Sequence, residues 1–354
     1  MIGLLGFFAI WGVTRAMALP RGLFLGLMAL WWLVLLALTL PVLLAERGLD
    51  PSGTLRLPPP FVGGDFMGWA VLGLLVGIIA GYRIILRRIR ANSTPPTAPP
   101  ITNTAALTDT EITRYARHIT LREIGGPGQK ALKGARVLVV GAGGLGAPAL
   151  MYLAAAGVGT IGVIDDDVVE VTNLQRQIIH ADARIGMPKV QSAMVAMQAI
   201  NPHIVVRPYN RRLTAQIADV VADYDLVLDG SDNFDTRYLV NAACVAAGIP
   251  LIAAAITQWE GQLSLYHPAK GGPCFACLFP IRPAPGLVPT CAEAGVAAPL
   301  PGVIGTLMAL EAVKHITGAG ETLTGRLMLF DGLMADTRFI KAARHAGCTV
   351  CGQT

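Results

Sequence analysis

One hydrophobic run limits the folds that are open to this chain of 354 residues. Residues 22–45 read GLFLGLMALWWLVLLALTLPVLLA and contain no charged side chain. A helix needs about 20 apolar residues to cross the hydrocarbon core of a membrane, so this run predicts a transmembrane helix. The whole chain has a mean hydropathy of +0.54 and 14% charged residues. Because the apolar excess lies N-terminal to residue 91, that part does not belong to an ordinary soluble enzyme.

Two further stretches resemble membrane spans. Residues 66–86 are interrupted only by Arg83, which lies near one end and can extend its charge to the interface. Residues 2–19 form a shorter run that contains Arg15. A signal peptide is the alternative for this run, but a basic start and a small-residue cleavage site are lacking. We therefore expect two or three transmembrane helices within residues 1–90.

The basic residues predict the orientation of these spans. A cluster of arginines directly follows the last span: Arg83, Arg87, Arg88 and Arg90. The loop between the second and third hydrophobic runs carries two arginines against three acids. Because basic residues stay on the cytoplasmic side, we expect a multi-pass protein of a bacterial-type inner membrane with its C-terminal part in the cytoplasm. The net charge of +5 is largely this cluster, so it requires no nucleic-acid partner.

A proline-rich linker at 91–106 separates the membrane region from a domain at 107–354. Strand and helix patterns alternate in this domain, which predicts an α/β, Rossmann-like, mostly parallel sheet with helices on both faces. The predicted strands are 135–141, 159–167, 203–210, 225–233 and 250–256, with an edge strand at 262–268. The predicted helices are 107–119, 147–158, 189–201, 215–224, 237–248 and 302–318.

A glycine-rich turn follows the first predicted strand. Its glycines are Gly141, Gly143, Gly144 and Gly146. They allow a tight turn from strand to helix and bring backbone N–H groups close to a phosphate at the helix N-terminus. Asp165 ends the next strand, where an acid binds ribose hydroxyls. These residues predict a nucleotide site but do not separate NAD from ATP, and close packing of strand against helix is the alternative.

Three charged residues further along favour ATP. Arg176 and Lys189 follow the second strand, and cations there stabilise the β- and γ-phosphates as pyrophosphate leaves. Two solvated surface cations are the alternative. Asp232 follows a later strand and suits Mg²⁺, which prefers one or two carboxylates together with phosphates. It could equally cap the helix that begins near Thr236.

Two C-x-x-C pairs predict a metal site. Cys274 and Cys277 form one pair, and Cys348 and Cys351 form the other. A single pair could be a thiol redox motif, but two pairs in a cytoplasmic domain indicate a closed zinc site of four cysteines with a structural role.

The other two cysteines differ in their surroundings. Cys244 lies in an apolar helix and is expected in the core. Cys291 lies in a loop rich in proline and glycine, where either a nucleophile or an inert thiol would fit.

Residues 107–354 resemble the MoeB/ThiF/HesA family of adenylyltransferases, relatives of the ubiquitin-activating enzymes. The motifs that carry the resemblance are, in order, RYARHI, GAGGLG, DDDVVEVTNLQRQ, GMPKV, DGSDN, EGQ, the two C-x-x-C pairs, TCAEAGV and GVIGTLMALEAVK. The resemblance implies ATP-dependent adenylation of the C-terminal Gly-Gly carboxylate of a ubiquitin-like sulfur carrier, MoaD-like or ThiS-like, with release of pyrophosphate. TCAEAGV and the final CGQ look more like the molybdopterin branch than the thiazole branch.

The resemblance also implies roles for single residues. The loop around Gly143 binds ATP and Asp165 binds its ribose. The phosphates are surrounded by Asn173, Arg176 and Lys189, Mg²⁺ is bound by Asp232, and Zn²⁺ is bound by the four paired cysteines. Arg117 reaches the ATP site of the other subunit, which implies a homodimer. Cys291 matches a cysteine that some members use for a persulfide or a conjugate with the carrier.

The chain lacks the rhodanese-like domain of some relatives, so we expect a separate sulfurtransferase or cysteine desulfurase as the sulfur source. Three other functions remain open from the sequence. The first is an ATP-dependent tRNA-base dehydratase of the same superfamily. The second is a membrane-tethered NAD-binding oxidoreductase or sensor, and the third is a non-catalytic membrane scaffold.

Overall fold

The computed structural model describes residues 2–16, 21–46, 65–92, 106–214, 217–282 and 294–352. The chain divides into two compact units, Met1–Ile101 and Thr102–Thr354. The linker predicted at 91–106 stays a prediction, because most of it lies outside the described residues.

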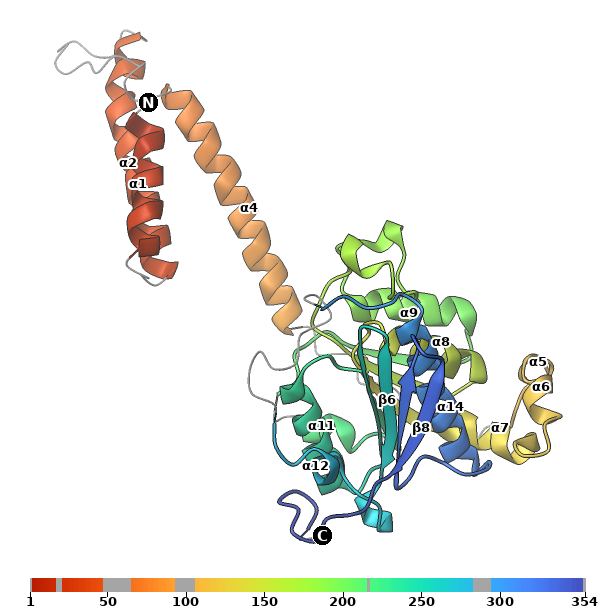
Figure 1. Cartoon of the computed structure of the whole chain (residues 1–354). Helices are drawn as coiled ribbons and strands as arrows, with labels where there is room; N and C mark the ends of the chain where they lie inside the picture. The colour runs from red at the N-terminus through yellow and green to blue at the C-terminus, as the bar shows by residue number, and fades with distance from the viewer. Residues whose placement is uncertain are drawn as a thin grey trace. The chain divides into compact units, whose positions relative to one another are not determined.

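In its described residues the N-terminal unit has three apolar helices (Figure 1). They are α1 (Ile2–Ala16), α2 (Arg21–Glu46) and α4 (Phe66–Asn92). By length and composition α2 and α4 are able to cross a membrane, through the segments Leu23–Leu40 and Phe66–Ile85. α1 has only 15 residues, which is short for a span. That any of them spans a membrane stays a prediction.

Two neighbouring tryptophans of α2 join the three helices. The Trp31 indole lies against Gly6 of α1, where any side chain larger than hydrogen would overlap the ring. The Trp32 indole lies in the same way against Gly73 of α4. Trp32 Nε1 also donates to the carbonyl of Trp69 at 2.9 Å. Gly6 and Gly73 therefore allow α1 and α4 to pack closely against α2.

The second unit is built on an eight-stranded sheet in the described residues, in the order β3-β2-β1-β4-β5-β6-β7-β8. Strands β1 to β5 are parallel where they pair, and β6, β7 and β8 are antiparallel. The strands are β1 (Arg136–Val140), β2 (Thr160–Ile164), β3 (Val205–Tyr209), β4 (Leu226–Asp229), β5 (Leu251–Thr257), β6 (Glu260–Tyr266), β7 (Arg326–Asp331) and β8 (Asp336–Lys341). This confirms the α/β fold with a mostly parallel sheet.

One strand prediction was wrong. The segment 262–268 was expected at the edge of the sheet, but β6 lies between β5 and β7. Leu263 and Leu265 are buried on one face of β6, and Ser264 is buried between them and donates to the carbonyl of Arg326 at 2.9 Å. The edge on this side of the sheet is β8, whose side chains are mostly exposed, and the opposite edge is β3.

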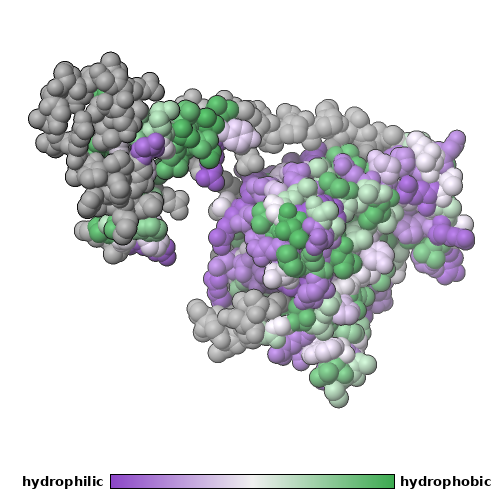
Figure 2. All heavy atoms as spheres, turned by 90° about the horizontal axis from the view of Figure 1, so that it is seen from above, coloured by the Kyte–Doolittle hydropathy of each residue, from purple (hydrophilic) through white to green (hydrophobic). Residues whose placement is uncertain are grey.

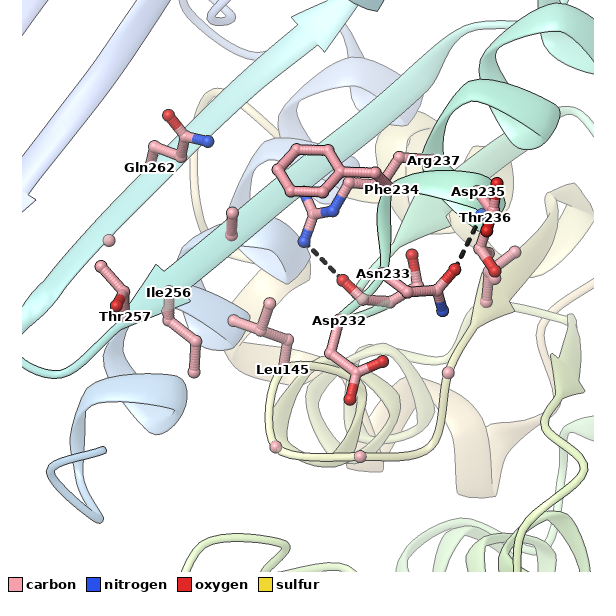
Figure 3. A pocket seen from close by; sticks show the side chains of 18 of the residues that line it. Leu145, Asp232, Asn233, Phe234, Asp235, Thr236, Arg237, Ile256, Thr257 and Gln262 are labelled. Atoms are coloured by element: carbon pink, nitrogen blue, oxygen red, sulfur yellow. Dashed lines mark hydrogen bonds between the residues drawn. The ribbon is translucent and has the colours of Figure 1, made fainter. Parts of the chain in front are cut away.

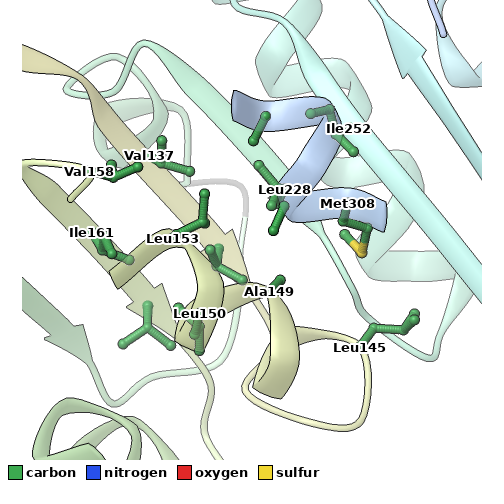
Figure 4. Packing of buried hydrophobic residues seen from close by; sticks show 14 of the residues in the cluster. Val137, Leu145, Ala149, Leu150, Leu153, Val158, Ile161, Leu228, Ile252 and Met308 are labelled. Atoms are coloured by element: carbon green, nitrogen blue, oxygen red, sulfur yellow. The ribbon is translucent and has the colours of Figure 1, made fainter. Parts of the chain in front are cut away.

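Helices cover both faces of the sheet. One face packs against α7 (Gly125–Gly134), α8 (Gly146–Ala156), α9 (Lys189–Ile200) and α14 (Leu300–Thr317), and the other packs against α10 (Ile217–Val221), α11 (Phe234–Ala247) and α12 (Phe275–Leu278). β1 shows the alternation that this requires, because Val137 and Val139 face the first group while Leu138 and Val140 face the second. Figure 4 shows α8 packed on the first face through Ala149, Leu150 and Leu153. Burial of each large aliphatic side chain contributes about 1.5–3 kcal/mol.

The unit begins with two short helices where one was expected, α5 (Asp109–Arg114) and α6 (Ala116–Ile119). A capping box is present at the start of α5, since Thr108 and Glu111 exchange hydrogen bonds. Tyr115 interrupts the helix and is buried against Gly157. Figure 1 shows α5 and α6 standing away from the sheet. Seen from above in Figure 2, the described surface of this unit is mainly hydrophilic around a smaller hydrophobic area.

Candidate active site

A cavity of about 1160 Å³ opens at the carboxyl ends of the parallel strands. This is the end of an open α/β sheet at which ligands bind. The predicted site residues that line it are Gly141, Gly143, Gly144, Asp165, Arg176, Lys189 and Asp232. The cavity continues past β5 along the antiparallel strands, where Thr257, Gln262 and Arg338 line it. It is therefore long enough to hold more than a nucleotide.

The glycine loop has its shape because two positions exclude a side chain. Gly141 has a φ of +89°, a conformation that residues with a Cβ rarely adopt. A Cβ at Gly146 would lie 1.9 Å from the carbonyl oxygen of Gly141. Gly146 starts α8 and does not line the cavity, so its role is the close packing of strand against helix. Gly143 and Gly144 face the cavity beside the N-terminus of α8, where backbone N–H groups favour an anion.

Asp165 follows β2 and holds the glycine loop as well as facing the cavity. Its Oδ2 accepts the backbone N–H of Ala142 at 2.8 Å, and its Oδ1 accepts the backbone N–H of Asp167 at 2.9 Å. Burial raises the pKa of Asp165, and the nearby Lys189 partly offsets this. Each carboxylate oxygen has a second lone pair, so the ribose hydroxyls expected here have acceptors.

The two predicted cations both line the cavity, but they differ in their surroundings. Arg176 is half-buried beside Gly144, and its Nη1 donates to the carbonyl of Thr172 at 3.1 Å. Lys189 is only 6% exposed, and its Nζ pairs with Asp167 Oδ2 at 2.7 Å. A solvated surface cation is therefore the wrong description of Lys189. Both side chains can meet the phosphate oxygens of a nucleotide in the cavity.

Asp232 is free of the capping role that was its alternative. Asn233 caps α11 instead, since its Oδ1 accepts the backbone N–H of Thr236 at 2.9 Å. Figure 3 shows the Asp232 carboxylate pointing away from Thr236, toward the loop that carries Leu145. An exposed carboxylate in this position suits Mg²⁺ bound to phosphates.

Besides Gly146, two predicted residues that the structure describes do not line the cavity, and a third predicted residue lies outside the described part of the chain. Asn173 does not line it, and its Oδ1 accepts the backbone N–H of Glu170 at 3.2 Å within a short 3-10 turn (Val171–Asn173). Arg117 is exposed on α6 and also does not line it. Cys291 lies outside the described residues. Their predicted roles stay predictions.

Gln177 and Arg237 are buried polar residues of the cavity wall that were missed from the sequence. Gln177 is 4% exposed and lines the cavity, and its Oε1 has no hydrogen-bond partner among the described residues. Arg237 is 7% exposed and donates to the carbonyl of Ser231 (Figure 3). Gln177 ends the NLQRQ segment, so that segment carried the signal. No sequence motif marks Arg237, because its place in the cavity wall depends on how α11 packs.

Arg237 also compensates a buried carboxylate. Asp229, at the end of β4, is fully buried. Burial raises the pKa of Asp229, while the positive charge of Arg237 and hydrogen bonds from Ser231 lower it. Removing Arg237 would leave a buried charge without compensation.

The four paired cysteines come together, as their spacing predicts. Their Sγ atoms all lie within 4.8 Å of one another. The distances are 3.8 Å for Cys274 to Cys277, 3.6 Å for Cys274 to Cys348 and 3.4 Å for Cys277 to Cys351. A tetrahedral zinc ion with bonds of about 2.3 Å would place its sulfurs about 3.8 Å apart, so the four thiols fit this metal.

The protein around the cysteines supports such a site. Burial opposes ionisation of Cys348, but the backbone N–H groups of Cys351 and Val350 and hydrogen bonds with Cys274 and Cys277 together lower its pKa to about 7. Burial raises the pKa of Cys274 and of Cys351. Asn241 of α11 accepts the backbone N–H of Phe275, next to Cys274, at 2.8 Å. The first pair is therefore tied to the core helix.

The sequence pattern of the ThiF family matches residues 115–350. A sulfur carrier protein adenylyltransferase of Thermus thermophilus is 49% identical over 250 residues, which are 69% of this chain and 92% of the relative. A molybdopterin-synthase adenylyltransferase of Escherichia coli is 47% identical over 70% of this chain and 100% of its own length. The solved structure of Escherichia coli MccB with ATP has a TM-score of 0.60 and 26% identity, over 70% of this chain and 76% of that chain.

Proposed function

This chain belongs to the ThiF family, and from that premise we propose that it adenylates the C-terminal carboxylate of a ubiquitin-like sulfur carrier at the expense of ATP. Relatives of this similarity are named for sulfur carrier and molybdopterin-synthase adenylylation. A carrier of the MoaD type that ends in Gly-Gly and serves molybdopterin synthesis is our preferred substrate, with a ThiS-type carrier for thiazole as the second.

One observation carries the proposal. A single cavity joins the glycine loop, a ribose acceptor in Asp165, cations in Arg176 and Lys189, and a carboxylate in Asp232. This set matches a nucleoside triphosphate rather than a dinucleotide, because cations and a metal-binding acid are required where pyrophosphate separates.

The reaction is an in-line displacement at the α-phosphorus. A carboxylate oxygen of the carrier forms a bond to that phosphorus, and the bond to the bridging oxygen breaks with its electron pair leaving on pyrophosphate. Arg176 and Lys189 would stabilise the charge that develops on the departing phosphates. The N–H groups of Gly143 and Gly144 would hold the phosphates beside the N-terminus of α8.

The extended part of the cavity fits the second substrate. Thr257, Gln262 and Arg338 line it beyond the glycine loop. A flexible glycine tail is narrow enough to lie along these strands and to bring its carboxylate to the nucleotide, while the body of the carrier stays outside. Holding the two reactants in line replaces a bimolecular encounter.

The metals have separate roles in the proposal. Asp232 would bind Mg²⁺, which neutralises phosphate charge. Cys274, Cys277, Cys348 and Cys351 would bind Zn²⁺, and a site with four protein ligands is closed to substrate.

We also propose a homodimer in which Arg117 reaches the partner's ATP site. Its exposure on α6, on helices that stand away from the sheet (Figure 1), supports this. Sulfur would come from a separate sulfurtransferase or cysteine desulfurase, and Cys291 is the candidate for a persulfide or carrier conjugate.

The membrane location is likewise a proposal. The lengths and compositions of α2 and α4 support it, as do the arginines that follow the last span. A bacterial-type inner membrane protein with a cytoplasmic catalytic unit would resist extraction by alkaline carbonate. Release of the full chain into the soluble fraction would contradict this.

Carrier-dependent exchange of labelled pyrophosphate into ATP tests the activity. The full chain in detergent should catalyse exchange with a Gly-Gly carrier and not with the same carrier lacking its last glycine. Absence of exchange with every Gly-Gly carrier of the host would overturn the proposal. Titration with NADH and with ATP, followed by calorimetry, separates it from the oxidoreductase alternative.

A further inference from the structure

A buried histidine outside the cavity holds the glycine loop. His180 is 7% exposed and does not line the cavity. Its Nε2 lies 2.9 Å from the carbonyl oxygen of Ala142, and its Nδ1 lies 2.9 Å from the hydroxyl of Ser192, which is fully buried in α9. The imidazole therefore connects the loop to a core helix.

These partners determine the tautomer of the imidazole. A carbonyl oxygen only accepts hydrogen bonds, so Nε2 must carry the proton that His180 donates to Ala142. In the neutral ring Nδ1 is then an acceptor, and the Ser192 hydroxyl donates to it. Burial, together with the nearby positive charges of Lys189 and Arg184, lowers the pKa of His180 and keeps the ring neutral.

The bond to Ala142 also orients the next amide. The peptide between Ala142 and Gly143 is trans, and in a trans peptide the C=O and the N–H point in opposite directions. Because the carbonyl of Ala142 points inward to His180, the N–H of Gly143 points to the other side, and Gly143 lines the cavity.

The remaining bonds of this loop keep the peptide in place. The N–H of Ala142 donates to Asp165 Oδ2 at 2.8 Å, and the carbonyl of Gly143 accepts from Ala147 at 2.8 Å. Among the described residues, His180 provides the side-chain hydrogen bond to the Ala142 carbonyl. Without it, that carbonyl is the group of the peptide that could turn toward the cavity, where it would repel a phosphate.

We propose that His180 is a positioning residue for the nucleotide, which fixes the Ala142–Gly143 peptide so that the Gly143 N–H is presented to a phosphate of ATP. The inference rests on the proposed function for the identity of the nucleotide. We therefore expect substitution of His180 to weaken the binding of MgATP and to leave the binding of the carrier unchanged.

Two substitutions separate the hydrogen bond from the volume of the ring. His180→Phe fills the space and has no donor, while His180→Gln places an amide N–H near the position of Nε2. In His180→Asn the side chain is too short to reach the carbonyl of Ala142, so this variant replaces His180→Phe if the latter does not fold. His267→Phe is the matched control, because His267 is as buried as His180, with 6% of its surface exposed, but follows β6 and does not line the cavity.

The full chain in detergent is titrated with MgATP by calorimetry, and the exchange assay gives KM for ATP and for the carrier separately. We expect His180→Phe to weaken MgATP binding about tenfold, in line with the loss of one buried hydrogen bond. KM for ATP should rise equally, while KM for the carrier stays constant. His180→Gln should recover most of the affinity, and His267→Phe should leave KM for ATP unchanged.

Folded His180→Phe and His180→Asn variants that bind MgATP like the unmodified protein would overturn the inference. An equal loss in His180→Gln would also overturn it, because a donor would then be insufficient. If the unmodified protein binds MgATP but shows no exchange with any carrier, the proposed function fails while the binding comparison still tests His180.

Discussion

The nucleotide cavity and the cysteine cluster are built at different ends of the same sheet. The cavity lies where β1, β2 and β4 end. The first cysteine pair follows the end of β6 that pairs with the beginning of β5, Tyr266 opposite Leu251, and the second pair follows β8. Figure 1 shows α12 and the end of the chain close together. The cavity is open, and Asp165, Arg176 and Asp232 reach it from loops. In contrast, Cys274 and Cys351 are fully buried.

The difference shows that the residues proposed for the reaction and the cysteines proposed to stabilise the unit lie in separate parts of one fold. The exposed Asp232 and the half-buried Arg176 at the cavity leave room for reactants, and their substitution removes few contacts of the core. The cysteines connect segments that are 74 positions apart, so their substitution affects the whole unit. We therefore expect changes at the cavity to alter the reaction with little effect on stability, and changes at the cluster to do the reverse.

The largest effect is expected from Cys351→Ser. Loss of one of four thiolates should abolish the proposed binding of zinc and lower the melting temperature of the α/β unit, because metal binding at such sites contributes directly to folding. Zinc content is measured by mass spectrometry and unfolding by calorimetry. Cys244→Ala is the matched control, since Cys244 is buried in the core on α11 and should keep the metal. Full zinc content in Cys351→Ser would contradict the prediction that this cluster binds the metal through all four cysteines.

Arg176→Ala tests the opposite end. Removing one preorganised cationic donor should lower the exchange rate by about 100- to 1,000-fold. The melting temperature and zinc content should stay constant, since Arg176 is only half-buried. Arg122→Ala, which changes an exposed arginine paired with its neighbour Glu123, is the control and should leave exchange unaltered. A large fall in stability for Arg176→Ala would show that the two ends are not separable.

Acid should destabilise the cavity end through His180. Burial lowers the pKa of His180 from 6.5 to about 4. Between pH 6.5 and pH 4 the imidazole of His180 is therefore protonated in the unfolded chain but neutral in the folded chain. The free energy of unfolding falls as the pH is lowered through this window, by up to about 3 kcal/mol.

Denaturant unfolding of the unmodified protein and of His180→Gln at pH 7 and pH 4 measures this loss. Acid release of metal from the cysteines affects both proteins alike, so it cancels in their difference. A difference that is independent of pH would contradict the prediction.

The smallest effect is expected from Asn233→Ala. Asn233 caps α11 beside the cavity, and loss of such a cap lowers the free energy of unfolding by about 1 kcal/mol. Asn233→Ser keeps a capping oxygen and should recover most of this. Exchange should change less than in Arg176→Ala, since Asn233 provides no charge to the phosphates. An unchanged free energy of unfolding would show that the cap contributes nothing.

Local patterns in the sequence predicted the parallel half of the sheet. The strands that lead to the glycine loop and to Asp165 and Asp232 are short apolar runs, and their carboxyl ends must meet. The antiparallel half was not predicted, because β7 and β8 carry charges such as Arg326, Asp331 and Arg338 among their apolar residues. β6 was therefore expected at an edge.

For the candidate site, the sequence predicted residue types better than surroundings. The cysteines were found because their spacing alone indicates a metal. The burial of Lys189 and its pair with Asp167 depend on how α9 packs, which no local pattern records. His180 and Arg237 were missed for the same reason, since each acts through a backbone carbonyl that only the folded chain brings near.

The separation of the two cysteine pairs along the chain also determines when the cluster can form. A chain is synthesised from its N-terminus, and its segments fold as they emerge. α2, α4 and strands β1 to β6 all leave the ribosome before Cys348, and so do α14, β7 and β8. The apolar helices are thus available to a membrane, and the glycine loop is complete, while the second cysteine pair is still missing. The proposed zinc ion would therefore bind only at the end of synthesis, and a chain that stalls before Cys348 would lack the complete set of ligands.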